Sequence, residues 1–208
     1  MSDLYEAILN GQAAAAAAAA DKALAGGATA LELVHRDMVP AMDEVGRRFE
    51  CEDYFVPELL LAARAMKAAL VPIRPLLAAS GAQPAGRVVI GTVKGDLHDI
   101  GKNIVAAMLE GAGFEVVDLG ADVEPQAFVE AVRANHAHLV CLSALLTVTM
   151  PSMQTTVEAF TAAGLRDRVK VMVGGAPVTQ RYADEIGADG YGDNAAAAVA
   201  VARRLVVE

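Results

Sequence analysis

The segment Gly91-Thr-Val-Lys-Gly-Asp-Leu-His-Asp-Ile-Gly-Lys-Asn-Ile-Val105 separates two different hydrophobic patterns. The apolar run at 88–90 that precedes it is typical of a buried strand. From residue 100 onward, apolar side chains recur at the spacing of one helix face. The sequence therefore predicts a strand, a polar loop and a helix. In an open α/β sheet such a loop lies at the carboxyl edge of the strands, where ligands bind.

The predicted loop carries side chains that are suited to holding a metal. The neutral imidazole of His98 can act as a metal ligand. Asp96, two residues earlier, could accept a hydrogen bond from the other ring nitrogen, which would fix the tautomer and make the ligand more basic. Gly95 and Gly101 allow a tight turn or the close approach of a bulky ligand. A lone Asp-x-His is usually a solvated pair, but the whole string directly after a strand is far more specific.

Residues 86–208 alternate between strand and helix patterns. Strands are predicted at 88–93, 114–119, 139–143, 169–173 and near Tyr191, and helices at 100–112, 125–134, 151–163, 179–186 and 195–205. This alternation predicts an α/β Rossmann-like domain with a doubly wound, five-stranded parallel sheet of flavodoxin type, in strand order 2-1-3-4-5. In that order the first and third strands are neighbours, so the His98 loop should lie beside Ser143.

Residues 1–85 are predicted to be an N-terminal four-helix bundle with its linker. Thr29 and Glu32 form a capping-box pattern at the start of the third helix, and Pro40 should kink that helix. A fourth helix is expected to begin near Pro57 and to run to Pro72 and Pro75. The small residues at 76–86 predict a linker, with 80–86 as a hinge.

Composition narrows the class of protein. The 208 residues are 55% hydrophobic, enough for real cores, but no apolar run is long enough to span a membrane. The net charge of −9 argues against nucleic-acid binding. No secretory signal pattern opens the sequence, and Cys51 and Cys141 are expected to be free thiols in a reducing cytoplasm.

The loop string resembles the cobalamin-binding domain of cobalamin-dependent methionine synthase and of the small corrinoid proteins of methyltransferase systems, and the resemblance covers nearly the whole chain. The family's Asp-x-His-x-x-Gly, Ser-x-Leu and Gly-Gly patterns are matched at Asp96, His98, Gly101, Ser143, Leu145, Thr147, Gly174 and Gly175. The resemblance implies that His98 replaces the dimethylbenzimidazole base as the lower axial ligand of cobalt. It also implies that the detached nucleotide tail enters a slot in the α/β domain.

Further roles follow from this resemblance. Asp96, His98 and Ser143 would form a proton relay toward solvent, so that proton uptake can accompany changes in cobalt coordination. The residues predicted to bind the cofactor in this domain are Gly95, Asp96, Leu97, His98, Asp99, Ile100, Gly101, Ser143, Leu145, Thr147, Gly174, Gly175, Tyr191, Asp193 and Ala195.

The helical half resembles the cap of the methionine synthase helical domain through Val45-Gly46-x-x-Phe49 and Phe55-Val56-Pro57. In that cap an aromatic and an aliphatic residue cover the upper cobalt face, which implies these roles for Phe49 and Val56; simple bundle packing is the alternative. His35 departs from the pattern, because methionine synthase carries Glu at the aligned place. It could approach the upper cobalt face or lie at the bundle surface.

These features favour a corrinoid methyl carrier that shuttles a methyl group between a substrate-specific methyltransferase and a second, acceptor methyltransferase, with a reductive activase as a further partner. A cobalamin-based sensor and the small subunit of an adenosylcobalamin mutase are the alternatives. A sensor of the light-sensing kind would carry a Trp-containing cap, and this chain has no Trp. The methyl donor stays open among methanol, methylamines, methoxylated aromatics and betaines.

Overall fold

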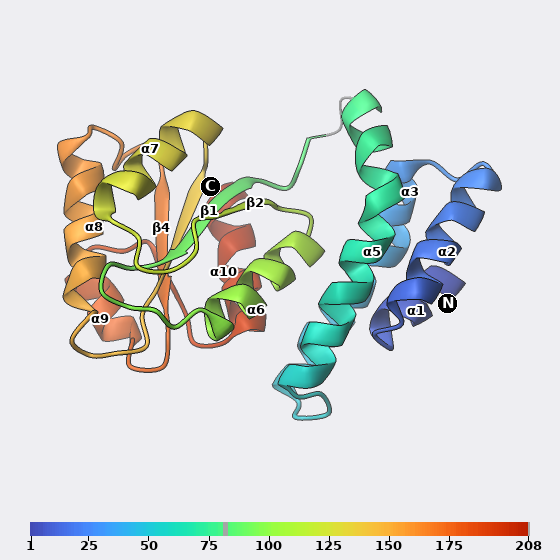
Figure 1. The fold of residues 1–208 in the computed structure, drawn as a ribbon, viewed down its shortest axis with the longest axis horizontal. Helices are drawn as coiled ribbons and strands as arrows, with labels where there is room; N and C mark the ends of the chain where they lie inside the picture. The colour runs from blue at the N-terminus through green and yellow to red at the C-terminus, as the bar shows by residue number, and fades with distance from the viewer. Residues whose placement is uncertain (81–82, 208) are drawn as a thin grey trace. The chain divides into compact units, whose positions relative to one another are not determined.

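The computed structural model describes residues 1–80 and 83–207. Residues 81 and 82 of the predicted linker and hinge lie outside the described residues. The chain forms two compact units, one of Met1–Pro84 with Glu110–Gly113 and one of Ala85–Leu109 with the chain from Phe114 onward (Figure 1). The predicted domain bounds, 1–85 and 86–208, stay a prediction.

The first unit is helical, as predicted. Its elements are α1 (Asp3–Leu9), α2 (Ala13–Ala25), α3 (Ala30–Leu33), the π-helical turn η1 (Val34–Met38), α4 (Val39–Glu50) and α5 (Val56–Ser80). The segments α3, η1 and α4 follow one another without a break and form the predicted third helix. Thr29 and Glu32 make the reciprocal bonds of a capping box. In α2 the alanines Ala16 and Ala20 are fully buried, so their small side chains allow close helix packing.

The third helix contains the π-helical turn η1, and the predicted kink at Pro40 stays a prediction. The Val39 amide donates to the Val34 carbonyl, five residues back, immediately before Pro40. Such π-turns and prolines are both recognised causes of helix bending.

The end of the fourth helix was predicted wrongly. Pro72 and Pro75 do not terminate α5, which continues through both residues to Ser80. An interior proline removes one helical hydrogen bond, but Leu70 and Ile73 beside these prolines are buried. Packing of this apolar face therefore outweighs the local breaking signal, as tertiary contacts often do.

The second unit is the predicted five-stranded parallel sheet in order β2-β1-β3-β4-β5. Its strands are β1 (Arg87–Thr92), β2 (Glu115–Asp118), β3 (Leu139–Ser143), β4 (Lys170–Gly174) and β5 (Gly190–Gly192). Its helices are α6 (Ile100–Gly111), α7 (Pro125–Asn135), α8 (Pro151–Ala162), α9 (Gln180–Glu185) and α10 (Ala195–Val207). Helices cover both faces of the sheet, with α7 and α8 on one side and α6 and α10 on the other (Figure 1).

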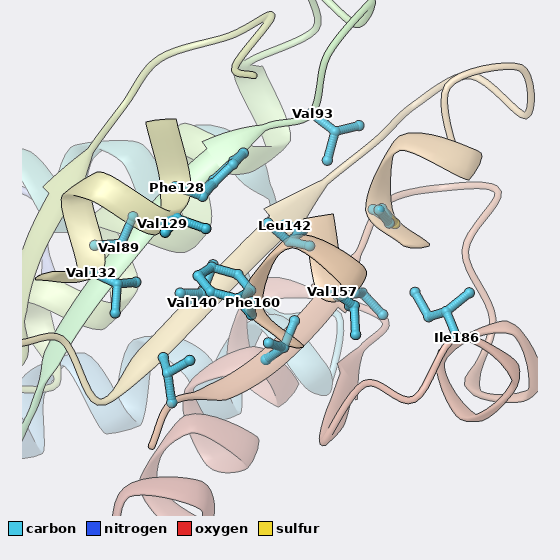
Figure 2. Close-up of a cluster of buried hydrophobic side chains, with 14 of the residues drawn as sticks. Val89, Val93, Phe128, Val129, Val132, Val140, Leu142, Val157, Phe160 and Ile186 are labelled. Atoms are coloured by element: carbon cyan, nitrogen blue, oxygen red, sulfur yellow. The ribbon is translucent and has the colours of Figure 1, made fainter. Parts of the chain in front are cut away.

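Apolar side chains from β1, β3 and β4 build the core on the α7–α8 side together with those helices (Figure 2). Phe128 of α7 and Phe160 of α8 are both fully buried there. A buried aromatic side chain contributes about 3 kcal/mol, so these helices are firmly attached to the sheet. The sheet thus provides a rigid base for the loops at its carboxyl edge.

Candidate functional site

The carboxyl ends of β1 and β3 lie side by side, with Thr92 paired in register with Ser143. The loops that follow these two strands therefore meet, as the predicted strand order required. Gly95 takes a positive φ of 84° in the first loop, a conformation that favours glycine. Its amide donates to Asp122 Oδ1 at 2.7 Å, which ties the turn to the segment after β2.

Asp96 is the buried centre of this edge, with no exposed surface. Its Oδ2 accepts hydrogen bonds from the Thr149 hydroxyl at 2.7 Å, the Leu145 amide at 2.8 Å and the Leu146 amide at 3.2 Å. Its Oδ1 accepts the His98 amide at 3.0 Å. Burial alone would raise the pKa of Asp96, but the bonds from Thr149, Leu145 and His98 hold this pKa well below its usual value. The carboxyl group is therefore ionised at neutral pH.

The imidazole of His98 is oriented by this carboxylate. Nδ1 of His98 lies 2.7 Å from Asp96 Oδ1. Because an ionised carboxylate can only accept hydrogen bonds, Nδ1 must carry the proton. Nε2 then presents a lone pair, and among the described residues it has no hydrogen-bond partner. The side chain is 50% exposed. An imidazole with one ring nitrogen bonded to a carboxylate and the other available is also common among metal-ligating histidines.

Exposed apolar side chains come from the same two loops and from the first residue of α6. Leu97 is 76% exposed, Ile100 73% and Val148 81%. Leu145 and Leu146, whose amides bind Asp96, are also exposed. Several large apolar residues left uncovered around one polar group indicate a ligand surface more than a solvent-facing loop.

The hydroxyl group that donates to Asp96 belongs to Thr149 and not to Ser143. Ser143 was predicted to continue the relay, but in the described part of the chain its side chain makes no hydrogen bond to Asp96. Thr149 supplies that bond. Its hydroxyl also lies 2.8 Å from the Leu146 carbonyl, but its single proton is held more strongly by the charged carboxylate.

The reason for this difference is the course of the loop after β3. This loop turns back before α8, so that Thr149 is buried while Thr147 is exposed. The sequence did offer a signal, the hydroxyl residue Thr149 two positions after Thr147, but the relay was predicted to run through Ser143. The predicted place of Thr147 in the nucleotide slot stays a prediction.

The remaining predicted residues lie at the ends of β4 and β5 and the start of α10. Their binding roles stay predictions: Gly174, Gly175, Tyr191, Asp193 and Ala195. A Cβ atom on Gly175, which has a φ of 129°, would lie 1.9 Å from the Ala144 carbonyl oxygen. The glycine is therefore required by the neighbouring loop itself, with or without a ligand. Asp193 is exposed and Ala195 is buried.

The predicted cap residues belong to the helical unit. Phe49 is half-buried near the end of α4, and Val56 is 40% exposed at the start of α5. Their covering role stays a prediction. His35 is exposed within η1.

Comparison of the sequence with known proteins identifies the family of this chain. A B12 binding domain model matches residues 86–200, and a second model described as a B12 binding domain matches residues 2–71. Trimethylamine corrinoid protein 2 of Methanosarcina mazei is 49% identical over 187 residues, which cover 89% of this chain and 86% of the relative. Dimethylamine corrinoid protein 1 of Methanosarcina acetivorans is 42% identical over 207 residues, covering 99% and 97%. The chain belongs to the corrinoid proteins of methyltransferase systems.

Solved structures agree with this assignment. A cobalamin-binding protein from Desulfitobacterium hafniense has a TM-score of 0.81 to this corrinoid protein and 36% identity, over 97% of this chain and 96% of that one. A chain of the methanol:cobalamin methyltransferase complex from Methanosarcina barkeri has a TM-score of 0.87 and 28% identity, over 99% and 78%. The corrinoid protein is thus a methyl carrier whose cofactor is cobalamin.

The residues present fit that cofactor. His98 offers a single imidazole nitrogen, which suits a metal already held by a macrocycle, and the exposed apolar side chains beside it suit the flat face of a ring. A Cβ atom on Gly101 would meet nothing within 4 Å, so the approach to this edge is open. No helix within residues 1–80 and 83–207 is long and apolar enough to cross a membrane.

Proposed function

We propose that His98 is the lower axial ligand of the cobalamin cobalt. Asp96 fixes the tautomer and orientation of the His98 imidazole, and Thr149 holds Asp96 in place. Cobalamin, when bound, supplies a cobalt that accepts and releases a methyl group. Asp96 holds the proton on Nδ1 of His98 and keeps Nε2 available. The observation that carries the proposal is the 2.7 Å contact between His98 and a fully buried, hydrogen-bonded carboxylate.

The same three residues can also link a change in metal ligation to the uptake of a proton. When Nε2 is not bound to metal it can take a proton from solvent, because the His98 side chain is half exposed. Nδ1 keeps its hydrogen bond to Asp96 when this happens. Thr149 keeps the carboxylate satisfied in both states. A change in metal ligation is in this way linked to proton uptake.

His98→Ala tests the ligand assignment. The purified variant, loaded with hydroxocobalamin, should lose the visible spectrum of histidine ligation and bind the cofactor at least ~10-fold more weakly. His136→Asn is the matched control, because His136 lies before β3 at the opposite edge of the sheet. A wild-type spectrum from His98→Ala would show that another group binds the cobalt.

We infer further that the methyl donor is a methylamine. The chain is 42–49% identical to tri- and dimethylamine corrinoid proteins, but 28% identical to the chain from the methanol complex. A methylamine-specific methyltransferase would then be the first partner, a second methyltransferase the acceptor partner, and a reductive activase would restore oxidised cofactor. The free thiols of Cys51 and Cys141 favour the reducing cytoplasm as the site of action.

Purified methyltransferases specific for trimethylamine, dimethylamine and methanol would test this donor class. Each enzyme would receive its own substrate and the reduced, loaded protein, and methylation would be followed by absorbance. We expect methylation with at least one methylamine enzyme and none with the methanol enzyme. Methylation by the methanol enzyme alone would contradict the donor class and leave the carrier role intact.

A further inference from the structure

Lys102, in the first turn of α6, has a buried ammonium group that the chemistry described so far does not use. Its side chain is 1% exposed, and Nζ pairs with Asp118 Oδ2 at the end of β2. Nζ also donates to Asn103 Oδ1 at 2.6 Å. A buried ion pair is weak evidence for added stability, since apolar residues of similar size often serve as well, and its best-attested use is to fix one arrangement.

A path of hydrogen bonds leads from this ion pair to the backbone of His98. The other carboxylate oxygen of Asp118 accepts the Gly120 amide at 2.9 Å. The Gly120 carbonyl accepts the Thr92 amide at 2.9 Å. The Thr92 hydroxyl, which is completely buried, donates to the His98 carbonyl at 2.9 Å.

A second path returns to the same loop from the other side of Lys102. The Asn103 side-chain amide donates to Asp99 Oδ2 at 3.1 Å, and the Asn103 backbone amide donates to the Asp99 carbonyl at 2.8 Å. Asp99 directly follows His98. The two paths therefore close a ring of contacts on the His98 carbonyl and on residue 99, whereas Asp96 binds the imidazole and the His98 amide.

We propose that Lys102 and Thr92 are positioning residues that fix the backbone of His98 against the ends of β1 and β2. The proposal rests on the proposed role of His98 as cobalt ligand. Asp96 orients the ring and binds the His98 amide, but Nε2 is placed correctly only if the carbonyl end of His98 is fixed as well. Groups that orient a metal ligand without touching the metal typically change affinity by about 10- to 100-fold when removed.

Lys102→Met is the main test. Met fills a similar volume, and Asp118, which is 38% exposed, can be hydrated once its partner is lost. We expect hydroxocobalamin to bind about 10-fold more weakly, with a smaller fraction of protein showing axial nitrogen splitting in the cobalt(II) EPR spectrum. In the cofactor-free variant the amides of Asn103 and Gly120 should exchange hydrogen faster, a readout that does not involve the cofactor.

Thr92 offers a pair of variants that alter a single group. Thr92→Val keeps the shape of the side chain and removes the hydroxyl, so it should weaken nitrogen ligation in the same direction. Thr92→Ser keeps the hydroxyl and should restore wild-type ligation. If Lys102→Met fails to fold, this pair decides the proposal alone: equal ligation in Thr92→Val and Thr92→Ser would overturn it.

Arg166→Met is the matched control for loss of an ion pair. Arg166 pairs with Asp189 at 2.8 Å at the amino edge of the same sheet, and both side chains are largely buried. It should lower thermal stability without changing cofactor affinity or EPR splitting. If Lys102→Met behaves in the same way, Lys102 only stabilises the fold.

His98→Ala separates the role of His98 as cobalt ligand from the positioning role of Lys102. If nitrogen splitting persists in His98→Ala, the ligand assignment is contradicted. If splitting is lost in His98→Ala but unchanged in Lys102→Met, only the positioning role of Lys102 is contradicted.

Discussion

Two carboxylates in this protein, Glu44 and Asp96, each accept several strong hydrogen bonds. The donors to Glu44 are close to it in sequence, whereas most donors to Asp96 are distant. Glu44 in α4 binds Arg47 and Arg48 of the same helix, at 2.7 and 2.9 Å. Asp96 in the α/β unit binds the imidazole two residues away and three donors from the loop after β3, about 50 residues along the chain.

The two sites also differ in the kind of donor. Bonds first from Arg47 and then from Arg48 lower the pKa of Glu44 to about 2. The pKa of Asp96 is also lowered, but mainly by a neutral hydroxyl and backbone amides that offset the cost of burial. A helix produces the first arrangement from its own periodicity. Only the meeting of two loops produces the second, and it leaves one nitrogen of His98 free for a ligand.

The largest expected difference between the two sites is in stability. Asp96→Ala leaves buried donors unsatisfied and should lower the free energy of unfolding by about 3 kcal/mol, at the upper end for bonds to a charged group. Glu44→Ala should cause a much smaller loss, because its arginines can be hydrated. Urea unfolding monitored by circular dichroism measures both. Equal losses would show that Asp96 is no more critical to the fold than a surface carboxylate.

Removing one donor should reveal which hydroxyl serves the buried carboxylate. Thr149→Val should lower the free energy of unfolding by about 1–2 kcal/mol and reduce histidine ligation of bound cobalamin, while Thr149→Ser should keep both near wild type. Ser143→Ala is the comparison, and we expect it to leave ligation unchanged. A loss of ligation in Ser143→Ala with none in Thr149→Val would restore the relay first predicted from the sequence.

Acid and salt should separate the two carboxylates further. Both pKa values are lower in the folded state than the ordinary values of 3.8 for Asp96 and 4.5 for Glu44. Each contribution to stability is therefore fully present above the ordinary value and is lost as the pH falls toward the folded value. For Glu44 this window runs from 4.5 down to about 2.

Below pH 5 the free energy of unfolding of the wild type should fall as the pH falls. This pH dependence should be smaller in Glu44→Gln and in Asp96→Asn, because each variant lacks one of the two titrating carboxyl groups. At pH 7, 1 M NaCl should reduce the difference between wild type and Glu44→Gln, because exposed ion pairs are screened. It should leave the difference for Asp96→Asn unchanged. Screening of both differences alike would mean that Asp96 is reached by solvent.

The smallest expected effect on the α/β unit comes from Phe49→Ala in the helical unit. If Phe49 covers the upper cobalt face, bound methylcobalamin should photolyse faster in the variant under anaerobic light, while histidine ligation stays intact. Free methylcobalamin provides the uncovered reference. Photolysis at the wild-type rate would show that Phe49 packs the bundle and covers nothing.

The sequence by itself determined the local features. Apolar periodicity predicted the strands and helices of the second unit, and the parallel order followed from the alternation of strand and helix. The contact between Asp96 and His98 could be predicted because two residues in one turn cannot lie far apart. The capping box at Thr29 is equally local, since its partner lies three residues away.

Only the tertiary structure decided which distant groups join these local features. Thr149 reaches Asp96 across 53 residues, and Asp118 reaches Lys102 across 16, at distances along the chain where spacing says nothing about direction. The same holds for α5, in which Pro72 and Pro75 predicted an end that burial of Ile73 overrides. The helix propensity of a residue acts locally and changes the free energy of helix formation by at most about 3 kcal/mol. The packing of whole elements is worth more, and it exists only once the chain has folded.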